Sequence, residues 1–406
     1  MLKNKKNIIT VLDICSSKIV CIIAKITNEG SYEIVGLGYT RAEGIKSGII
    51  SDLKLAQNSI LHCIAEAEKM CGIKPFKAYV TVSSNYLLSQ HIITETSIIG
   101  KEITNRDLNK LLLDAIQICK NQQLEIVHSF ACNYILDGHH GITNPIGMFG
   151  NKLGCKFHIL SAPANNLLNL HNCIIKSGLE IESYVSSSYA AGLACLTKDE
   201  IETGVMLIDF GAGVTSFAVF ENEQMVYVNA IPIGGNHITS DIAKILCISL
   251  NEAERIKNLY GGVLVNEIDE SELIQLTLNN DDNNCISRIH LIEIISARID
   301  EILQIIQDRI ANDGMKIHNF VITGGVARTL GLKEFIFKKL GGKVKISYHK
   351  SIMNLMERNN NLEISTALGV LSHVSENIMS NIESEDDKSK KNTTKRFISF
   401  LEKMFS

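Results

Sequence analysis

The sequence predicts an α/β fold made of two related halves, because two similar strand–turn–strand units occur in it. One unit, residues 207–220, reads LIDFGAGVTSFAVF: an apolar run that ends in an acid, Asp209, then a glycine turn and a second apolar run. The other unit lies near the N-terminus, where residues 8–14 form an apolar run that carries Asp13 near its end and residues 19–26 form a second run. Each unit is typical of two strands joined by a tight turn, with one acid held beside the turn.

The turn residues of the unit at 207–220, the second in chain order, are of types that bind phosphate. Glycine lets main-chain N–H groups approach an oxyanion closely, so Gly211, Gly213, Thr215 and Ser216 form a plausible phosphate cradle. An acid beside a phosphate favours a divalent cation, and Mg²⁺ keeps most of its waters, so one or two carboxylates are sufficient. A single turn of this kind is also common in ordinary hairpins. Because the unit occurs twice, we interpret the chain as two halves that face each other across a nucleotide.

A third glycine-containing element, residues 320–328, reads FVITGGVAR. It predicts a buried strand, a glycine pair and then a helix, and the glycines would let the backbone pass close to a flat ring or a ribose. Between the second and third elements, Glu254 and Lys257 are three residues apart on a predicted helix and therefore share one face. From spacing alone, an ion pair on a solvated helix face explains these two residues.

The hydrophobic pattern between the turns predicts alternating helices and strands. In residues 52–71, for example, Leu53, Ala56 and Ile60 recur at helical spacing, and Gly72 ends the helix. We interpret residues 141–150 as a loop, 234–237 as a turn and 261–284 as a solvated loop or two edge strands. Further helices are predicted at residues 105–120, 165–176, 238–247, 291–310, 332–340 and 365–379, with another that opens at 185–192; further strands are predicted at 32–39, 78–82, 89–97, 125–136, 224–233 and 344–348.

Residues 84–161 differ from the chain around them in their pattern of predicted strands, helix and loop, and they are interpreted as an inserted α+β subdomain. Its helix begins after Thr104, a typical N-cap, with Asp107 in the first helical turn. The rest of the folded chain then divides into a first lobe, a second lobe and an outer subdomain of the second lobe. The first lobe covers residues 1–83 and 162–200, and the second lobe covers residues 201–237 and 311–380. The outer subdomain covers residues 238–310.

The C-terminal part has a different composition. Residues 381–394 hold an acidic run followed by lysines and hardly any apolar side chain, so they predict a flexible linker. The last twelve residues, KRFISFLEKMFS, predict a short amphipathic helix that could dock on its own domain, bind a partner groove or lie in a membrane interface. The linker argues against the first alternative. An apolar face opposite basic side chains favours an anionic membrane surface, with contacts from Lys395, Arg396, Phe397, Ile398, Phe400, Leu401, Met404 and Phe405.

One tail of this length should bind a membrane only marginally, because ordering a dozen residues costs on the order of 1 kcal/mol or more for each residue. Several tails on one polymer would bind through a high effective concentration. The sequence therefore predicts that membrane attachment is coupled to self-association.

The composition excludes several other classes of protein. The chain of 406 residues is 45% hydrophobic and long enough for two or more cores, and its net charge of −4 argues against general nucleic-acid binding. Lysines precede the apolar run at residues 8–12, but Asp13 cuts that run too short for a signal peptide. Since the sequence also lacks an apolar stretch long enough to span a bilayer, we expect the body of the protein to be cytosolic.

Several motifs resemble those of one known family over nearly the whole chain. They are DICSSK, GITNPIGMFG in the inserted subdomain, SSYAAGLA before LIDFGAGVTSFAVF, IPIGGNHITSDIA, NEAERIK, VITGGVARTLGL, TALGVL and the terminal amphipathic segment. The chain resembles the FtsA family of bacterial cell-division proteins, within the actin, Hsp70 and sugar-kinase superfamily. The NPIGM loop, the position of the insertion and the tail carry the specific part of this resemblance. It implies an actin-like two-lobed ATPase fold with the nucleotide between the lobes.

The resemblance also implies roles for individual residues. Two acids would hold Mg²⁺ through water, other residues would contact the phosphates, the ribose and the adenine of ATP, and hydrolysis would be slow at most. The acids are Asp13 and Asp209; the phosphate contacts are Ser16, Ser17, Lys18, Gly211, Gly213 and Thr215; the ribose contacts are Glu254 and Lys257; the adenine contacts are Gly324 and Gly325. Cys15 stands where the family usually has glycine, and a positive φ at this cysteine would cost about 1 to 2 kcal/mol.

The resemblance finally implies partners and a location. The helix at 291–310 and its surroundings would receive the C-terminal peptide of the tubulin-like protein FtsZ, with Arg288 and Arg298 at matching basic positions. The chain would form filaments with itself, bind later (downstream) division proteins through the inserted subdomain, and sit peripherally on the cytoplasmic side of the plasma membrane at the division site. Two alternatives remain open: a metabolic kinase of the same fold, which would have no use for a membrane tail, and a pilus-assembly adaptor, which carries no such tail.

Overall fold

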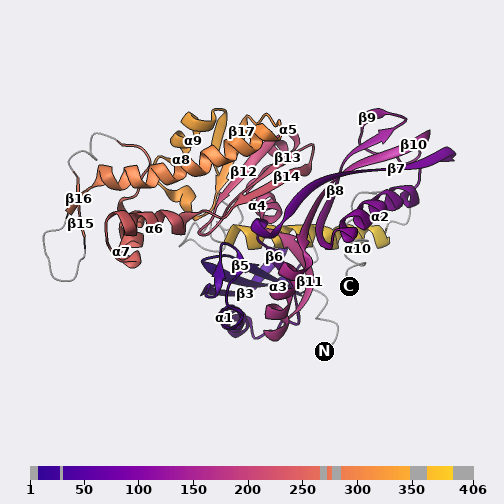
Figure 1. Cartoon of the computed structure of the whole chain (residues 1–406). Helices are drawn as coiled ribbons and strands as arrows, with labels where there is room; N and C mark the ends of the chain where they lie inside the picture. The colour runs from indigo at the N-terminus through magenta and orange to yellow at the C-terminus, as the bar shows by residue number, and fades with distance from the viewer. Residues whose placement is uncertain (1–7, 28–30, 266–271, 277–284, 348–363, 387–406) are drawn as a thin grey trace.

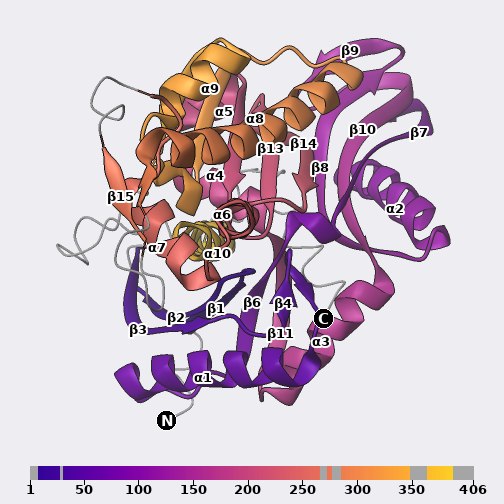
Figure 2. The ribbon, with the colours of Figure 1, turned by 60° about the vertical axis from the view of Figure 1, so that its left-hand side comes forward.

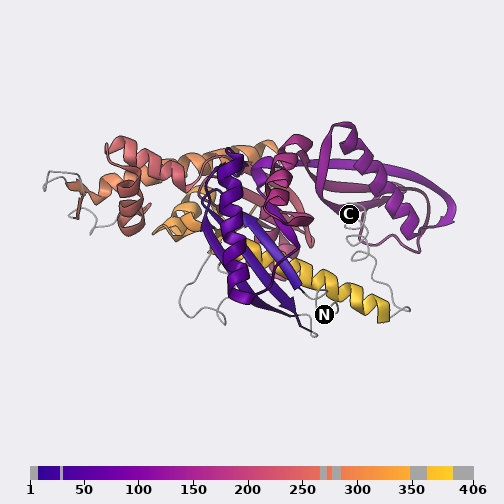
Figure 3. The ribbon, with the colours of Figure 1, turned by 90° about the horizontal axis from the view of Figure 1, so that it is seen from below.

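The computed structural model describes residues 8–27, 31–265, 272–276, 285–347 and 364–386, and it gives no side-chain description for residues 376–386. The structure has three main β-sheets with helices packed around them (Figure 1). Figure 3 shows the inserted subdomain at one end of the molecule and the short strands β15 (Leu273–Gln275) and β16 (Cys285–Ser287) at the other. The linker residues 387–394 and the amphipathic tail, 395–406, lie outside the described residues.

The first sheet has the strand order β11-β6-β1-β2-β3. Strand β1 alternates between two cores: Leu12 and Ile14 pack with α1 and α3 on one face, and Ile9 and Val11 pack with α4 and α10 on the other. Both faces are covered, which is why the central strands β1 and β2 are largely apolar. The elements are β1 (Ile8–Ile14), β2 (Lys18–Ile26), β3 (Tyr32–Arg41), β6 (Lys77–Val82), β11 (Glu180–Ser186), α1 (Leu53–Cys71), α3 (Ala164–Lys176), α4 (Ser187–Cys195) and α10 (Ser365–Asp386), with the small hairpin β4 (Ile45–Lys46) and β5 (Ile49–Ile50).

The second sheet repeats the topology of the first. In each sheet an antiparallel three-stranded meander continues into two parallel strands, so the order β14-β13-β12-β17-β18 corresponds to β3-β2-β1-β6-β11. The two related halves predicted from the acid-bearing turns are therefore present. The elements are β12 (Val205–Phe210), β13 (Thr215–Glu221), β14 (Gln224–Ile231), β17 (Asn319–Thr323), β18 (Lys343–Ile346), α5 (Lys198–Thr203), α9 (Leu332–Leu340) and a 3-10 turn, η3 (Gly325–Arg328).

The outer part of the second lobe is helical. Its core joins the second sheet to α6 (Gly235–Ile245), α7 (Leu250–Tyr260) and α8 (Arg288–Asn312), next to the short pair β15 (Leu273–Gln275) and β16 (Cys285–Ser287). The prediction of a turn at residues 234–237 is wrong, because α6 already begins at Gly235. The Nδ1 atom of His237 accepts the N–H of Gly234 at 3.2 Å and so caps this helix.

The inserted region forms its own sheet and core. The strand order is β7-β10-β8-β9, and α2 covers one face of the sheet. Thr104 and Asp107 form the expected capping box at the start of α2. The central strand β10 was not predicted, and the predicted loop at 141–150 contains the end of β9 and the start of β10. The elements are η2 (Ser84–Tyr86), β7 (Leu88–Glu102), α2 (Asn105–Asn121), β8 (Leu124–Leu136), β9 (His139–Ile142) and β10 (Phe149–Pro163).

The last described helix, α10, belongs to the first lobe. Its residues Ala367, Leu368 and Leu371 share a core with β1 and β2, and Figure 2 shows α10 nearly end-on, on the side of the first sheet opposite α1. The sequence-based division, which placed residues up to 380 in the second lobe, is wrong for this helix. The predicted linker is also wrong for residues 381–386, because α10 continues to Asp386. None of the described helices is long and apolar enough to cross a bilayer.

A hydrogen-bonded joint connects the inserted subdomain to the second lobe. The Nδ1–H of His158 donates to the carbonyl of Met225 at 2.6 Å, and the hydroxyl of Ser89 donates to His158 Nε2 at 2.8 Å. Ser89 Oγ also accepts the N–H of Val228 at 3.3 Å. Burial lowers the pKa of His158 to about 4, so the ring is neutral at physiological pH and its two nitrogens keep these separate roles.

The close approach of α10 to α4 generates the first prediction. A Cβ added at Gly369 would lie 1.9 Å from the backbone oxygen of Ala190, an atom that moves only if the helix moves. We expect Gly369→Ala to lower the free energy of unfolding by about 1 to 3 kcal/mol, measured by urea denaturation, although alanine is the better helix former. Gly262→Ala is the matched control, since a Cβ there would meet only ordinary contacts of 3.6 Å or more. Equal stability of the two variants would contradict the close packing.

Candidate functional site

The first acid, Asp13, is buried near the end of β1 and is held by two neighbours. Thr81 of β6 donates from Oγ1 to Asp13 Oδ1 at 2.7 Å, and the Thr81 Oγ1 atom also accepts the N–H of Ile14 at 3.1 Å. The thiol of Cys15 donates to the other carboxylate oxygen, Oδ2, at 3.5 Å. Cys15 does not adopt a positive φ, so the backbone strain considered for a cysteine at this position is not present.

The second acid, Asp209, lies near the end of β12, opposite Ser216 of β13 and beside Thr323 of β17. In the turn that follows, the N–H of Gly211 donates to the carbonyl of Val214 at 3.0 Å. Thr215 is fully buried, and its hydroxyl donates to the carbonyl of Ile233 at 2.8 Å. The structure therefore gives Gly211 and Thr215 roles inside the turn, and the expected phosphate contact by the Thr215 hydroxyl is not available in this conformation.

The two acid-bearing turns touch each other. A Cβ at Gly213 would lie 2.6 Å from Ser16 Oγ, so this position has no room for a side chain while the turns are in contact. Ser16 Oγ also accepts the N–H of Gly48 at 2.8 Å. Ser17 is exposed and Lys18 is partly buried in the same first turn. The structure thus brings the predicted first and second phosphate turns to one point, although they come from different lobes.

The third element, the glycine pair, lies directly against the second acid. Gly324 has a φ of 90°, and a Cβ there would lie 2.4 Å from the carbonyl oxygen of Phe210 and 2.5 Å from Asp209 Oδ1. Both the backbone conformation and the space therefore require glycine. A Cβ at Gly325 would meet no atom within 4 Å, so this glycine faces open space.

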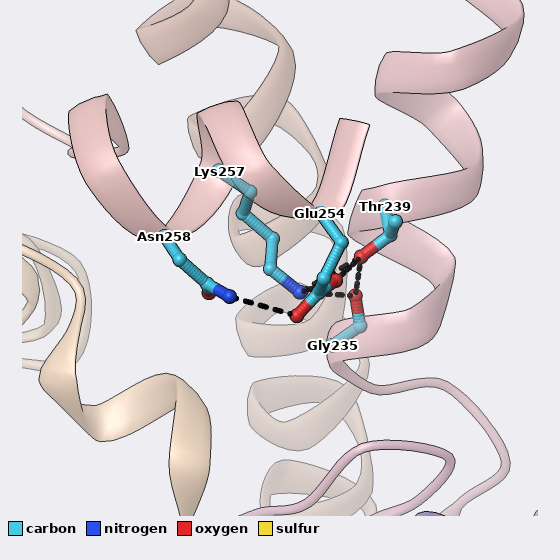
Figure 4. Close-up of polar contacts among 5 residues, drawn as sticks. All are labelled: Gly235, Thr239, Glu254, Lys257 and Asn258. Carbon is cyan, nitrogen blue, oxygen red and sulfur yellow. Dashed lines mark hydrogen bonds and ion pairs between the residues drawn. The ribbon is translucent and has the colours of Figure 1, made fainter. Parts of the chain in front are cut away.

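Glu254 and Lys257 of α7 form an ion pair that is hydrogen-bonded to Thr239 and Gly235 of α6 (Figure 4). Lys257 Nζ lies 2.6 Å from Glu254 Oε2 and 2.7 Å from the hydroxyl of Thr239, which also donates to Glu254 at 2.5 Å. The Thr239 hydroxyl is 3.1 Å from the Gly235 carbonyl, and the Gly235 N–H donates to the carbonyl of Gly211 at 3.0 Å. The ion pair expected from spacing is present, and it adjoins the glycine turn rather than a remote helix face.

Burial and neighbouring charges shift the pKa values of the acids. Burial raises the pKa of Asp13, although the hydrogen bond from Thr81 and the charge of Lys18 oppose it. Burial raises the pKa of Asp209 to about 6, with Lys18 opposing the shift and Asp13 adding to it. Burial alone would raise the pKa of Glu254, but hydrogen bonds from Lys257 and Thr239 hold it below its ordinary value. A cation close to Asp13 and Asp209 would therefore stabilise both carboxylates.

The residues present fit a hydrated magnesium ion better than a directly ligated metal. The described residues contain no group of three or more His, Cys, Asp and Glu side chains that could hold a metal ion. Two carboxylates with raised pKa values, next to turns that exclude side chains at Gly213 and Gly324, instead match an ion that keeps most of its waters and binds with a phosphate.

The two arginines expected at the partner surface already have partners within the chain. Arg288 Nη1 pairs with Glu272 at 2.6 Å, and its Nε donates to the carbonyl of Tyr260 at 3.1 Å. Arg298 Nε pairs with Asp241 of α6 at 2.6 Å, and its Nη1 pairs with Glu301. These ion pairs tie α8 to its neighbours, so an acidic ligand on this surface would compete with them. The expected membrane contacts Lys395, Arg396, Phe397, Ile398, Phe400, Leu401, Met404 and Phe405 lie outside the described residues.

Sequence reasoning missed several residues that complete the site. Thr81, which holds Asp13, is marked in the sequence only as a hydroxyl near the end of an apolar strand. Ser47 and Gly48 lie in a short glycine-containing loop that contacts both turns: the N–H of Gly48 donates to Ser16 Oγ at 2.8 Å in the first turn, and the Cα of Ser47 would be 3.2 Å from a Cβ at Gly213 in the second. A cavity of about 500 Å³ was also not expected; it lies between β8 of the inserted subdomain and α3 and β11 of the first lobe.

Comparisons with known proteins agree with this arrangement. The family model "Cell division protein FtsA" matches residues 206–369, and the model "SHS2 domain inserted in FTSA" matches residues 85–161. A curated cell division protein FtsA from Agrobacterium fabrum is 34% identical over 384 residues, with 90% of this chain and 87% of the relative covered. Among solved structures, a chain of the PilM-PilN type IV pilus biogenesis complex has a TM-score of 0.66 at 13% identity, covering 90% of this chain and 98% of that one. MreB5 of Spiroplasma citri bound to ADP has a TM-score of 0.56 at 14% identity, covering 92% and 98%.

Two sheets of the same topology, joined at acid-bearing turns and carrying an inserted subdomain, define an actin-like protein. Within that class, the chain belongs to the FtsA family and is a cell-division protein. The expected actin-like fold with an inserted α+β subdomain is confirmed.

The raised pKa of Asp209 generates the second prediction. Because the pKa of about 6 in the folded chain lies above the ordinary value of 3.8, ionisation of Asp209 destabilises the folded state. This cost is absent below about pH 3.8 and complete above about pH 6. In metal-free buffer, Asp209→Asn should therefore be more stable than wild type at pH 7.5, by up to about 3 kcal/mol, and the difference should shrink as the pH falls toward 4.

Urea denaturation across this pH range measures the effect. Asp114→Asn, at an exposed acid on α2, is the control and should change the free energy of unfolding by less than about 0.5 kcal/mol. A destabilised Asp209→Asn variant at pH 7.5 would show that the carboxylate stabilises the metal-free chain, contrary to this account.

Proposed function

We propose that the chain is an ATP-binding cell-division protein that self-assembles on the inner face of the plasma membrane at the division site, tethers the FtsZ ring there and recruits later division proteins. The contact of Ser16 with Gly213 carries the nucleotide part of this proposal, because it brings the acid-bearing turns of two equivalent sheets together. Membership of the FtsA family supports the division part.

For the nucleotide, we assign the acids and turns as follows. Asp13 and Asp209 hold Mg²⁺ through water, and the bound Mg²⁺ supplies positive charge that neutralises the phosphates. Ser16, Ser17 and Lys18 contact the phosphates from the first lobe, and the backbone at Gly213 contacts them from the second. Because Ser16 and Gly213 touch in this structure, phosphates between them push the turns apart. Nucleotide binding is thereby coupled to the angle between the lobes.

The base and ribose lie farther into the second lobe in this proposal. Glu254 accepts a hydrogen bond from a ribose hydroxyl while Lys257 and Thr239 keep its carboxylate in place. Gly324 and Gly325 flank the adenine, and the open space beside Gly325 leaves room for a flat ring. Hydrolysis is slow at most.

The later division proteins have a candidate docking place beside the inserted subdomain. The cavity of about 500 Å³ is lined largely by apolar side chains such as Val127, Phe130 and Leu168. Two strand edges border it, those of β11 and β8. Strand β11 is the last strand of its sheet. Within the described residues β9 pairs with β8 only at Tyr134 and Leu136, so it does not cover the part of β8 that lines the cavity. An extended segment of a later division protein could add to such an edge.

The third prediction tests the membrane tether with anionic vesicles. We expect the full chain to co-sediment with the vesicles, and more so with Mg²⁺-ATP, because assembly multiplies the marginal affinity of each tail. A chain that ends at Thr394 should stay in the supernatant. Within the tail, Phe400→Glu should abolish sedimentation, and Ser399→Glu, which adds the same charge on the polar side, is the matched control.

The vesicle experiment also separates the alternatives. If the truncated chain sediments as well as the full chain, the tail is not the anchor and the pilus-type adaptor becomes the better description. If neither chain sediments, the membrane tether is wrong and the tail is better described as a helix that binds a partner protein.

The fourth prediction concerns the FtsZ peptide and the arginines of α8. We expect Arg298→Ala to weaken binding of the C-terminal peptide of FtsZ about 10-fold, corresponding to about 1.4 kcal/mol, in a fluorescence-anisotropy titration. Asp241→Ala breaks the same intramolecular ion pair but keeps the arginine, so it should bind the peptide at least as well as wild type. Equal losses in both variants would mean that Arg298 acts only by holding α8 to α6.

A further inference from the structure

Each oxygen of the Asp13 carboxylate accepts a hydrogen bond from a side chain. One donor, Thr81, lies outside the turn motif, and the other, Cys15, is an unusual residue within it. Thr81 donates to Oδ1 at 2.7 Å from the neighbouring strand β6, and Cys15 donates to Oδ2 at 3.5 Å from within the turn. Asp13 and Thr81 are each 1% exposed. Hydrogen bonds to a charged group in such a buried place are stronger than ordinary ones, and losing a partner there leaves a group unsatisfied.

The hydroxyl of Thr81 fixes the direction of the carboxylate. A hydroxyl has one proton and two lone pairs, and here the proton goes to Asp13 Oδ1 while a lone pair accepts the N–H of Ile14 at 3.1 Å. Thr81 therefore joins the side chain of Asp13 to the backbone of the next residue in β1. Strand β6 lies parallel to β1 and is itself fixed by β11 on its other side, so the anchor is rigid.

With Oδ1 engaged by Thr81, Oδ2 is the carboxylate oxygen available to a cation. The neighbour of Oδ2 is a thiol, which is a weak hydrogen-bond donor. A water of a hydrated Mg²⁺ is a much better donor and can replace the thiol at little cost. The cysteine at position 15 thus contacts Asp13 in the metal-free chain without blocking the oxygen that the metal site needs.

We propose that Thr81 is the positioning residue of the magnesium site: by holding Oδ1 of Asp13, it presents Oδ2 to the hydrated ion. In the same proposal, the Cys15 thiol is displaced from Oδ2 when Mg²⁺ binds. This inference rests on the proposed function, in which Asp13 holds Mg²⁺ through water. It adds two residues, one on a strand outside the turn, that set how much Mg²⁺ the nucleotide site requires.

The test measures binding of a fluorescent ATP analogue to the full-length chain, as Mg²⁺ is titrated from an EDTA-containing buffer. Thr81→Val removes the hydroxyl with little change in shape, and we expect it to raise the Mg²⁺ concentration at half-saturation about 10-fold while metal-free binding of the analogue stays unchanged. Thr81→Ser keeps the hydroxyl and should stay within about twofold of wild type. Thr81→Cys keeps a weaker donor and should fall between them, which provides the test if the valine variant does not fold.

Cys15→Ala tests the second part of the proposal. Removing the thiol should lower the half-saturating Mg²⁺ concentration by about twofold or more, because the metal no longer displaces a donor; an unchanged or raised value would overturn the displacement. Thr94→Val is the matched control for Thr81: its hydroxyl donates to the carbonyl of Leu111 at 2.8 Å in the core of the inserted subdomain, far from the turns in sequence. It should leave the Mg²⁺ requirement unchanged.

The outcomes separate this inference from the proposed function. If wild type binds the analogue with Mg²⁺ but Thr81→Val has the wild-type requirement, or Thr81→Ser is as defective as Thr81→Val, the positioning role is wrong and the proposed function stands. If Thr94→Val shifts the requirement as much as Thr81→Val, the effect is general loss of stability and the inference also fails. A wild-type chain that binds no nucleotide at any Mg²⁺ concentration would overturn the proposed function and this inference with it.

Discussion

The structure depends on keeping two carboxylates charged near the ends of two largely apolar strands, β1 and β12. Asp13 and Asp209 occupy equivalent positions, each near the end of the strand at which an antiparallel hairpin meets a parallel neighbour. Burial raises the pKa of both acids, and Lys18 is a cation that acts on both. Holding them this way costs stability in the metal-free chain. A cation that binds here with its phosphate removes this cost, so it stabilises the fold more than it would at a solvated site. Ligand binding and conformation are therefore linked.

Contact between the lobes depends on small residues in α4. Ala190 of α4 belongs to the core that includes α10, and Ala191 belongs to the core of the second sheet, so this short helix is packed on both sides. A Cβ at Gly192 would lie 2.2 Å from the ring of Phe220, and on the other side of α4 a Cβ at Gly369 would lie 1.9 Å from the carbonyl oxygen of Ala190. The motif SSYAAGLA therefore has a packing reason: larger side chains would separate the two sheets and the turns that meet between them.

Residues whose role is local were predictable from the sequence, and residues whose role depends on distant partners were not. The acid-bearing hairpins, the helix α1 with its end at Gly72 and the capping box at Thr104 follow from periodicity and turn chemistry. Strand β11 was missed because, at the edge of its sheet, it carries polar residues, and α10 was assigned to the wrong lobe because chain order says nothing about which core a helix joins. Thr81 was missed for the same reason: one hydroxyl in an apolar strand has no pattern, and only the fold shows that it lies 2.7 Å from Asp13.

The connections of the inserted subdomain explain how a change at the turns reaches it. Its chain enters and leaves through the first lobe, by η2 and α3, yet His158 and Ser89 bond it to Met225 and Val228 of β14 in the second lobe. Strand β14 pairs with β13, which begins at Thr215 in the second turn, and Ser216 of β13 accepts a hydrogen bond from Ser188, which is itself bonded to Ser84 of η2. Because the subdomain is covalently attached to one lobe and hydrogen-bonded to the other, the lobes cannot change their angle without either turning the subdomain or breaking these bonds. Because His158 is neutral across the physiological pH range, protonation does not break the hydrogen bonds of this joint. A change in the conformation of the turns is therefore what alters them.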